Sequence, residues 1–375
     1  MSALFSPCSI GQLTLKNRIA IAPMCQYSSS DGLASDWHMF HFGAMSLSGA
    51  GLFCIEATAV EPAGRITAAD LGLWSDETEA ALAKVLMAVR KYSDMPIAIQ
   101  LAHAGRKASC QVPWEGGKQV APNNGGWQTV SSSGLAHNAD DHAPLSLDHA
   151  GLHRVREAFV SAALRAHRLG IEAIEIHAAH GYLLHQFLSP LANQRTDEYG
   201  GSLENRMRFP LEVLDAIRAA LPPEAVVGIR ISATDWADGG WDIAECLTFA
   251  LALKQHACSF IHVSSGGLSA AQKIPTTPGY QVGFAEQIRK ATGLPVIAVG
   301  LITEAAHAEA IIASGQADMV ALARGILYDP HWPWHAAAQL GATVQVPPQY
   351  LRSQPAAYKA LLQALHITHK DVAAG

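Results

Sequence analysis

The sequence has few charged residues and no long hydrophobic run. Only 15% of its 375 residues are charged while 49% are hydrophobic, so we expect a large buried core rather than disorder. The net charge is −6 and no basic stripe is visible, which argues against nucleic acid as a partner. No apolar window approaches the roughly 20 residues that cross a bilayer, and a signal-peptide pattern is missing. We therefore expect a cytoplasmic protein without membrane contact.

Cysteine pairs are also missing. The six cysteines are scattered and form no Cys-x-x-Cys pair, which is typical of reduced thiols and argues against a disulfide framework or a zinc site. Histidine offers the alternative of a metal site built from His103, His177, His180 and His185. No strand-end carboxylate or His-x-His pattern supports that alternative, so we expect no bound metal.

Short apolar segments rich in Ile and Val recur along the chain, at residues 19–24, 52–60, 97–102, 173–178, 226–232, 260–265, 295–300 and 319–325. Helical patterns lie between most of them or follow the last, at residues 36–47, 76–92, 152–169, 203–221, 243–256, 285–292, 304–314 and 333–340. Apolar strands that alternate with amphipathic helices indicate parallel strands buried on both faces. Eight such units favour an α/β fold with a single (β/α)8 TIM barrel. An open doubly wound sheet would need an early Gly-x-Gly-x-x-Gly turn, which is not present.

Two segments depart from a minimal barrel. Residues 9–14 predict a small N-terminal hairpin that closes the barrel floor. Residues 103–147 follow the third strand and are rich in Gly, Pro, Asn, Ser and His, which predicts a cap excursion over the active-site mouth. We expect one barrel domain over residues 1–355, followed by a C-terminal extension over 356–375.

The strand at 173–178 leads into three titratable side chains, His177, His180 and Tyr182. Each can give a proton or a hydrogen bond to a substrate, and the carboxyl ends of barrel strands share one mouth. No lysine ends a strand, so Schiff-base chemistry is not expected. Acidic residues near the mouth are few, so paired-carboxylate glycoside hydrolysis fits poorly.

Four polar positions at other strand ends predict a flat, phosphorylated cofactor. Gly300 and the turn at 323–325, with the guanidinium of Arg324, follow the seventh and eighth strands, where barrels bind phosphate. Gln100 can read a heterocycle edge, and Arg230 is a buried cation that can hold negative charge on a ring. Together these groups predict a seat for flavin mononucleotide.

Four longer motifs then match a known family, at residues 22–27, 100–108, 177–183 and 193–206. They resemble the Old Yellow Enzyme flavoproteins, and the short length with Cys25 and Tyr27 resembles the thermophilic-like, xenobiotic-reductase branch. The resemblance runs from about Leu4 to Pro355. It implies an FMN-dependent ene-reductase that takes electrons from NADPH or NADH. Its substrates would be activated C=C bonds in enones, enals and maleimides, with nitro compounds as a further class.

The same resemblance implies roles for individual residues. His177 and His180 would bind the substrate oxygen together with Tyr27, and Tyr182 would protonate the substrate carbon. Cys25 would also tune the flavin potential. The residues implied to contact FMN are Pro23, Met24, Cys25, Ala57, Gln100, Arg230, Gly300, Ala323 and Arg324.

The C-terminal residues 349–352 resemble a segment that reaches into a neighbouring subunit's site in this branch. Arg352 would be the intruding side chain, which implies a homodimer or homotetramer. Leu351 stands where related chains have Trp, so the shape of the pocket differs at that position.

Rival functions remain open from the sequence. Another FMN barrel dehydrogenase would need a different proton donor. A flavin-binding protein without turnover would show no NADPH oxidation that accelerates with an enone. A metal hydrolase would contain zinc and no flavin. The sequence does not distinguish NADPH from NADH, because no separate dinucleotide-binding fold is present.

Overall fold

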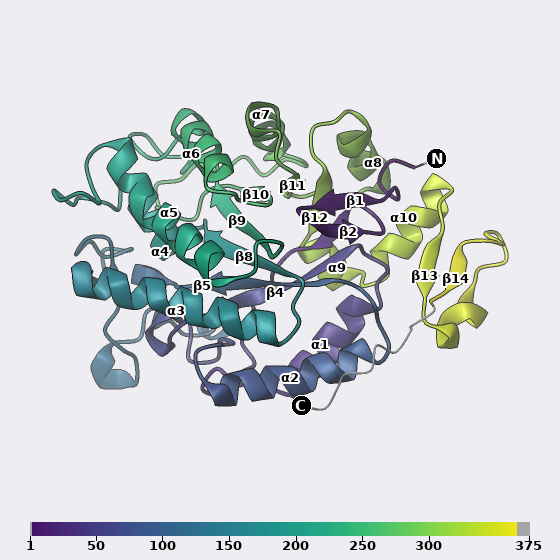
Figure 1. The fold of residues 1–375 in the computed structure, drawn as a ribbon, viewed down its shortest axis with the longest axis horizontal. Helices are drawn as coiled ribbons and strands as arrows, with labels where there is room; N and C mark the ends of the chain where they lie inside the picture. Colours follow the sequence, from purple (N-terminus) through teal and green to yellow (C-terminus); the bar gives the residue numbers. More distant parts are fainter. Residues whose placement is uncertain (1, 366–375) are drawn as a thin grey trace.

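The computed structural model describes residues 2–365. Its barrel strands are β3 (Ile19–Ile21), β4 (Leu52–Ala59), β5 (Ile97–Ala102), β8 (Ala173–Ala178), β9 (Val226–Ser232), β10 (Ile261–Ser264), β11 (Val296–Ala298) and β12 (Met319–Leu322). They close a barrel in the order β10-β11-β12-β3-β4-β5-β8-β9, with every neighbouring pair parallel (Figure 1). The predicted TIM barrel is confirmed.

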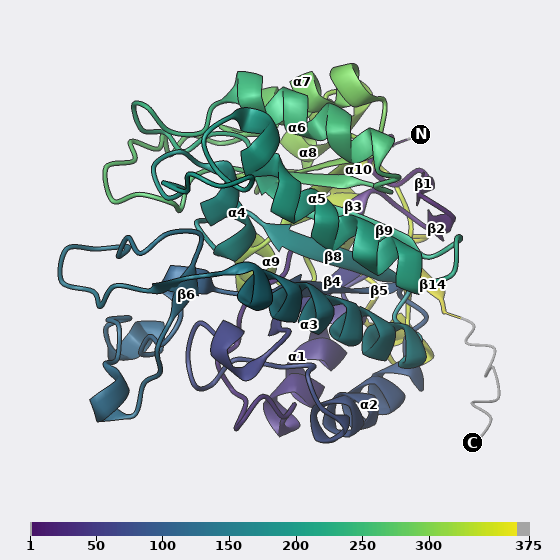
Figure 2. The same cartoon turned by 60° about the vertical axis from the view of Figure 1, so that its left-hand side comes forward.

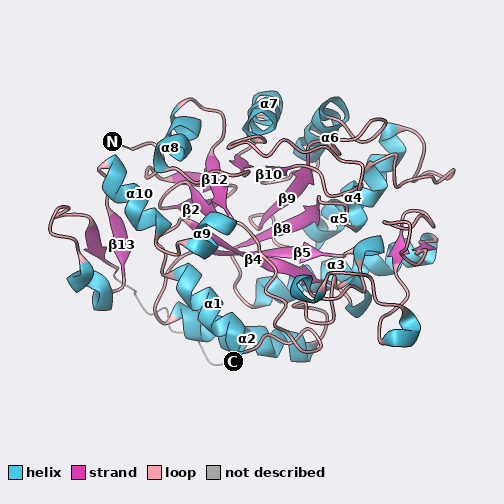
Figure 3. Ribbon diagram, turned by 180° about the vertical axis from the view of Figure 1, so that it is seen from behind, coloured by secondary structure: helices cyan, strands magenta, loops and turns pink. Residues whose placement is uncertain are grey.

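Helices surround the strands, as the view from behind shows (Figure 3). They are α1 (Asp36–Ser46), α2 (Asp76–Arg90), α3 (His149–Arg168), α5 (Leu203–Ala220), α6 (Ile243–Gln255), α7 (Val282–Thr292), α8 (Ala305–Ala313) and α10 (Trp332–Leu340). Two short helices were not predicted, α4 (Leu183–Leu188) and α9 (Arg324–Tyr328). The last strand was expected to reach residue 325; it ends at Leu322, because Arg324 already opens α9.

The hairpin at the N-terminus is confirmed. Strands β1 (Cys8–Ile10) and β2 (Leu13–Leu15) pair antiparallel. Ile10 and Leu15 are fully buried and join a cluster with small and apolar side chains from the barrel strands, among them Ala20, Leu52 and Met319. The hairpin therefore closes one end of the barrel with apolar packing, and polar chemistry has to lie at the other end.

The excursion after β5 contains three short 3-10 helices, η2 (Gly105–Lys107), η3 (Pro113–Glu115) and η4 (Pro122–Asn124), and the two-residue strands β6 (Val130–Ser131) and β7 (Leu145–Ser146). Strands β6 and β7 pair with each other. Figure 2 shows this excursion on the opposite side of the barrel from the β1–β2 hairpin. It thus lies at the end where the barrel strands terminate.

A small unit follows α10. Strand β13 (Val344–Val346), the 3-10 helix η5 (Pro348–Ser353) and strand β14 (Leu362–Ala364) form it, and Val344 pairs with Leu362. The domain boundary expected at residue 355 falls between these two paired strands, and residues 366–375 of the expected extension lie outside the described residues. In the part of the chain that is described, no helix has the length and apolar character that a membrane span requires.

Candidate active site

Strand register places polar side chains on two levels inside the barrel. Gln100 of β5 is level with Glu175 of β8. Two residues further along β8, toward the mouth, His177 is level with Arg230 of β9. Arg230 is in turn level with His262 of β10. Alternate residues of a strand point to the same face, so Glu175 and His177 both point into the barrel. The apolar floor thus gives way to a polar layer toward the mouth.

Four of these residues, Gln100, Glu175, Arg230 and His262, form what we call the buried polar cluster. Gln100 Nε2 donates a hydrogen bond of 2.7 Å to Glu175 Oε1, and His262 Nδ1 donates one of 2.8 Å to Glu175 Oε2. Burial alone would raise the pKa of Glu175, but the His262 ring, the charge of Arg230 and the Gln100 hydrogen bond outweigh it and the pKa lies below its ordinary value. Glu175 is therefore ionised.

The cluster also contains unused polar atoms. Within residues 2–365, Arg230 Nε and His262 Nε2 are buried without a hydrogen-bond partner. Unpaired buried polar atoms cost free energy, so we expect a ligand or a water molecule that the chain itself does not supply to bind them. The sequence left open whether Arg230 pairs with a core acid or holds a cofactor. In the structure the negative charge of Glu175 stabilises the Arg230 cation, but Arg230 Nε still has no hydrogen-bond partner among the described residues.

Sequence reasoning missed Glu175 and His262. A signal was present, because each is a polar residue inside an otherwise apolar barrel strand, as Arg230 is. A buried charge needs a partner of opposite sign. Glu175 was the acid within the fourth strand that could have been matched to Arg230.

The three rings predicted from β8 come together. The rings of His177 and His180 are perpendicular with centroids 5.1 Å apart, and those of His177 and Tyr182 are nearly perpendicular at 4.9 Å. Ala179 N–H donates to His177 Nδ1 at 3.2 Å, so the proton of a neutral His177 lies on Nε2. The Nε2 atom of His180 lies 2.7 Å from Ser264 Oγ.

Both imidazoles are neutral hydrogen-bond donors. Burial, followed by the charge of Arg230, lowers the pKa of His177 and that of His180 well below the ordinary value. Burial raises the pKa of Tyr182 well above 10, so its phenol keeps the proton at neutral pH. The three side chains can donate hydrogen bonds or a proton without carrying charge.

Residues 179–182, here called the catalytic turn, hold His180 in an uncommon backbone conformation. His180 has φ +58° and Gly181 has φ +74°. A non-glycine residue in the left-handed region is strained and persists only where its surroundings fix it. Ser232 Oγ accepts the His180 N–H at 3.0 Å, and Lys107 Nζ donates to the His180 carbonyl at 2.9 Å. Both backbone polar groups of His180 are therefore bound by side chains.

A second pair of side chains fixes Gly181. His185 Nδ1 accepts the Gly181 N–H at 2.9 Å, and Gln186 Nε2 donates to the Gly181 carbonyl at 2.7 Å. Both residues come from α4, the short helix that directly follows the turn. Helix α4 thus acts as a support for the catalytic turn.

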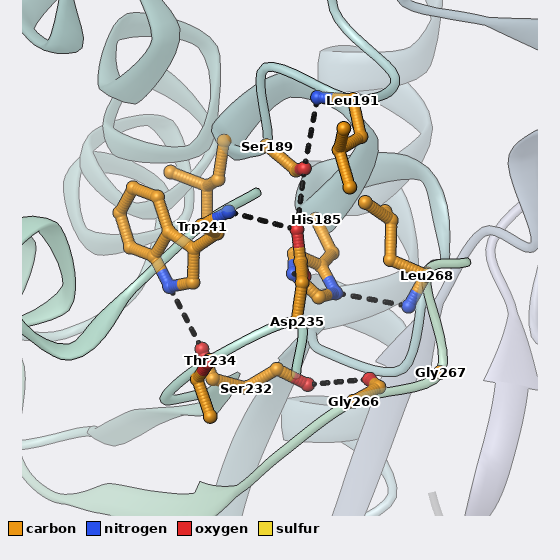
Figure 4. A network of polar contacts seen from close by, with 12 residues as sticks. His185, Ser189, Leu191, Ser232, Thr234, Asp235, Trp241, Gly266, Gly267 and Leu268 are labelled. Atoms are coloured by element: carbon orange, nitrogen blue, oxygen red, sulfur yellow. Dashed lines mark hydrogen bonds and ion pairs between the residues drawn. The ribbon is translucent and has the colours of Figure 1, made fainter. Parts of the chain in front are cut away.

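Behind His185 lies a buried carboxylate, as Figure 4 shows. His185 Nε2 is 2.9 Å from Asp235 Oδ1, and Asp235 Oδ2 accepts hydrogen bonds from Ser189 Oγ at 2.6 Å and from Trp241 N–H at 2.9 Å. Trp241 Nε1 donates to the Ser232 carbonyl at 2.9 Å. The support thus connects α4 with the end of β9 and the loop after it.

The strand-1 residues lie beside the same mouth. Pro23 and Met24 are partly buried and follow β3 directly. Burial raises the pKa of Cys25 well above its ordinary value, with Asp70 and Glu56 adding and the hydrogen bond from Tyr27 opposing. Cys25 is therefore a neutral thiol. Tyr27 also keeps its proton, because burial raises its pKa.

A cavity of about 580 Å³ is lined by Tyr27 and by residues of the excursion after β5, among them Lys107. Lys107 Nζ also lies 5.1 Å from the centroid of the Tyr182 ring, and burial lowers the pKa of Lys107 to about 8. The cavity thus adjoins the side chains next to the catalytic turn. It is a candidate entrance for a substrate.

The expected phosphate end has a glycine with an unusual backbone conformation and an exposed cation. Gly300 has φ +134°, and a Cβ built there would lie 2.9 Å from Gln281 Nε2, so only glycine fits. Arg324 is exposed and makes no hydrogen bond or ion pair with the described residues, and Ala323 precedes it as the residue before α9. Ala57 follows an irregularity in β4 and is level with Gln100.

The remaining predictions concern Arg352 and a metal. Arg352 is exposed on η5 and takes part in none of the contacts of the catalytic turn. His103 pairs with Glu61 and His185 with Asp235, so the four histidines considered as ligands do not converge. Among residues 2–365, possible ligand atoms gather only at His149, Asp197 and Glu198, which lie at the surface.

These features fit a flavin mononucleotide. Arg230 Nε is an unpaired buried donor, Gly300 has a backbone conformation that other residues rarely adopt, and Gln100 Oε1 accepts no hydrogen bond from residues 2–365. A flavin offers acceptors and an N–H donor on its ring and a phosphate on its chain. Each unused group therefore has a counterpart in that cofactor.

Comparison with known proteins agrees with this geometry. A family model described as NADH:flavin oxidoreductase / NADH oxidase family matches residues 3–342. An NADPH dehydrogenase of Geobacillus thermodenitrificans (strain NG80-2) is 42% identical over 353 residues, covering 94% of this chain and 98% of that protein. An NADPH dehydrogenase of Bacillus subtilis (strain 168) is 42% identical over 351 residues, covering 93% and 98%.

Solved structures of morphinone reductase are also similar to this chain. Morphinone reductase aligns with a TM-score of 0.75 at 30% identity, covering 95% of this chain and 93% of that one. A structure of morphinone reductase in complex with tetrahydroNAD aligns with a TM-score of 0.73 at 30% identity, covering 97% and 95%.

Proposed function

Because the chain belongs to the NADH:flavin oxidoreductase / NADH oxidase family, and is thus a flavin oxidoreductase of the Old Yellow Enzyme type, we propose that it is an FMN-dependent ene-reductase. It reduces the activated C=C bonds of enones, enals and maleimides, and extends to nitro compounds. The finding that most supports this is that the rings of His177, His180 and Tyr182 lie together. His177 is level with Arg230 of the buried polar cluster, so the three rings adjoin that cluster.

The cofactor of the proposal is FMN, bound without a covalent link. Arg230 and Gln100 would hold its ring from below, and Gly300 and Arg324 would hold its phosphate. The further contacts we propose are Pro23, Met24, Cys25, Ala57 and Ala323. When bound, FMN supplies two electrons as a hydride equivalent, first accepted from NAD(P)H.

The chain's own residues perform the rest of the chemistry. His177 and His180 donate hydrogen bonds to the substrate's carbonyl or nitro oxygen, with Tyr27 as a third contact. Negative charge grows on that oxygen during reduction, so these donors stabilise the transition state more than the ground state. Tyr182 keeps its proton on Oη and delivers it to the substrate carbon as general acid.

The reductant binds at the same mouth in this proposal. Morphinone reductase has been solved with tetrahydroNAD, and the two bacterial relatives are named NADPH dehydrogenases. Both support a nicotinamide dinucleotide as the electron source. We propose the cytoplasm, where NAD(P)H is generated, as the place of action.

A visible absorption spectrum of the purified protein tests the proposal. We expect the bands of an oxidised flavin, bleaching with NADPH under anaerobic conditions and returning with 2-cyclohexenone. A protein that stays colourless after addition of FMN would overturn the flavin assignment. Bands that bleach but return only with oxygen would instead favour a flavin-binding protein or another FMN barrel dehydrogenase.

Assembly is the second part of the proposal. We propose a homodimer or homotetramer in which Arg352 reaches a neighbouring site, because Arg352 is exposed and remote from its own catalytic turn. Helix α1 exposes Trp37 and Phe40 by 53% and 74%, and exposed large apolar side chains mark association surfaces. Analytical ultracentrifugation tests the oligomer. An Arg352→Ala variant with unchanged KM for 2-cyclohexenone would contradict the role of Arg352.

A further inference from the structure

Two members of the buried polar cluster, Glu175 and His262, have no role in the chemistry above. Glu175 is 2% exposed inside the barrel, and its two carboxylate oxygens accept hydrogen bonds from side chains of β5 and β10. We propose that Glu175 is a positioning residue of the flavin site, which fixes the amide of Gln100 and offsets the charge of Arg230, and thereby sets the reduction potential of the flavin. This inference rests on the proposed function, since it requires FMN above the cluster.

The first effect of Glu175 concerns the orientation of an amide. A carboxylate can only accept hydrogen bonds, so Gln100 has to turn its NH2 group toward Glu175. Gln100 Oε1 is then directed away from Glu175 and accepts no hydrogen bond from residues 2–365. The pyrimidine edge of a flavin has one N–H donor between two carbonyl oxygens. Glu175 therefore decides that Gln100 offers an acceptor to that edge.

The second effect concerns charge. Arg230 is a buried cation, and a reduced flavin carries more negative charge than an oxidised one, so Arg230 favours the reduced form. The Glu175 carboxylate opposes this effect from the neighbouring strand β8, one level further from the mouth than Arg230. His262 adds no charge, because burial and the charge of Arg230 lower its pKa. Such effects are larger in a buried site than in water.

The chain provides a matched control. Asp235 and His185 form a second buried carboxylate–histidine pair, with a separation of 2.9 Å against 2.8 Å for Glu175 and His262. This pair binds the catalytic turn through Gly181 and makes no contact with the buried polar cluster. Substitution of Asp235 therefore perturbs a pair of the same chemistry without changing the charge next to Arg230.

The experiment compares midpoint potentials of the FMN-loaded proteins. Glu175→Gln keeps the shape and removes the charge. We expect the ratio of reduced to oxidised FMN affinity to rise at least about tenfold, which corresponds to a potential about 30 mV more positive for a two-electron couple. Asp235→Asn should leave the potential at the wild-type value. Equal potentials for Glu175→Gln and wild type would overturn the proposal.

A second variant separates charge from packing. His262→Leu keeps the carboxylate and removes the Nδ1–H that binds it, so the negative charge is less offset and the potential should become more negative. If His262→Leu instead moves the potential in the positive direction or not at all, the proposal is overturned, and this test stands even if Glu175→Gln does not fold. A wild-type protein that binds no FMN would overturn the proposed function itself, which is a distinguishable result.

Discussion

The buried polar cluster and the catalytic turn are adjacent parts of one site, and they differ in how their polar groups are satisfied. In the turn, side chains bind both backbone polar groups of His180 and of Gly181. In the cluster, Arg230 Nε and His262 Nε2 have no partner among the described residues. The turn is thus preorganised by the protein alone, while we expect a ligand to complete the cluster. Variants in the two regions should therefore respond differently, and measurements on them test this difference.

The largest effect is expected at the turn. Tyr182→Phe removes the proposed proton donor but keeps the ring, so alkene reduction should slow by about 10²- to 10⁴-fold, the range for a general acid. Reduction of the flavin by NADPH should stay near the wild-type rate, because that half-reaction needs no proton from Tyr182. Anaerobic stopped-flow measurement of both half-reactions checks this. Equal losses in the two would remove Tyr182 from the role of proton donor.

Loss of the support behind the turn should appear as instability. Asp235→Ala leaves His185 and the Ser189 hydroxyl without their acceptor, and loss of one partner of a buried pair costs about 3–5 kcal/mol. We expect this loss in the free energy of unfolding of the FMN-free protein, measured by urea denaturation. A loss of unfolding free energy seen only in the FMN-bound protein would show that the conformation of the catalytic turn depends on the cofactor.

The turn should also respond to alkaline pH through Lys107. Burial lowers the pKa of Lys107 to about 8 in the folded protein, while the unfolded chain titrates at its ordinary value of about 10.4. Between these values the unfolded state binds more protons, so stability rises with pH. Relative to Lys107→Met, the wild type should gain up to about 3 kcal/mol over this window.

Urea denaturation at pH 7.5, 9 and 10.5 measures that gain. Lys118→Met, at an exposed lysine of the same excursion, should follow the wild-type profile. A Lys107→Met profile parallel to that of the wild type would show that Lys107 does not titrate in this window.

At the cluster, the expected effect depends on the ligand. Arg230→Met removes the unpaired guanidinium, and a hydrogen bond to a charged group is worth about 1.5–3 kcal/mol, so FMN should bind about 10- to 150-fold more weakly. Fluorescence titration of the FMN-free protein measures this. Unchanged FMN affinity would mean that the unpaired Nε does not serve the cofactor.

The smallest effect is expected at Cys25. Its thiol is neutral, because burial raises its pKa, so Cys25→Ala removes a dipole and no charge. We expect less than about a threefold change in the ratio of reduced to oxidised FMN affinity, or about 15 mV. A shift larger than that of Glu175→Gln would show that Cys25, rather than the buried polar cluster, dominates the flavin potential.

The barrel and the three titratable side chains at its mouth could be predicted from local patterns in the sequence. Strand positions follow from runs of apolar residues, which depend only on neighbours in the chain. His177, His180 and Tyr182 lie within six residues, so one strand end brings them together. The seven-residue segment predicted for the last strand was too long, because nothing in its composition marks where Arg324 opens α9.

The hydrogen-bonded pairs of side chains from distant parts of the chain could be identified only in the folded structure. Glu175 meets Gln100 and His262, which are 75 and 87 residues away, because barrel closure fixes the register of β5, β8, β9 and β10. His185 meets Asp235 because the short helix α4, which was not predicted, folds back behind the turn. A shift of one residue in register would turn each of these side chains to the opposite face. The types of chemical group are therefore local properties of the sequence, while their pairing depends on closure of the barrel.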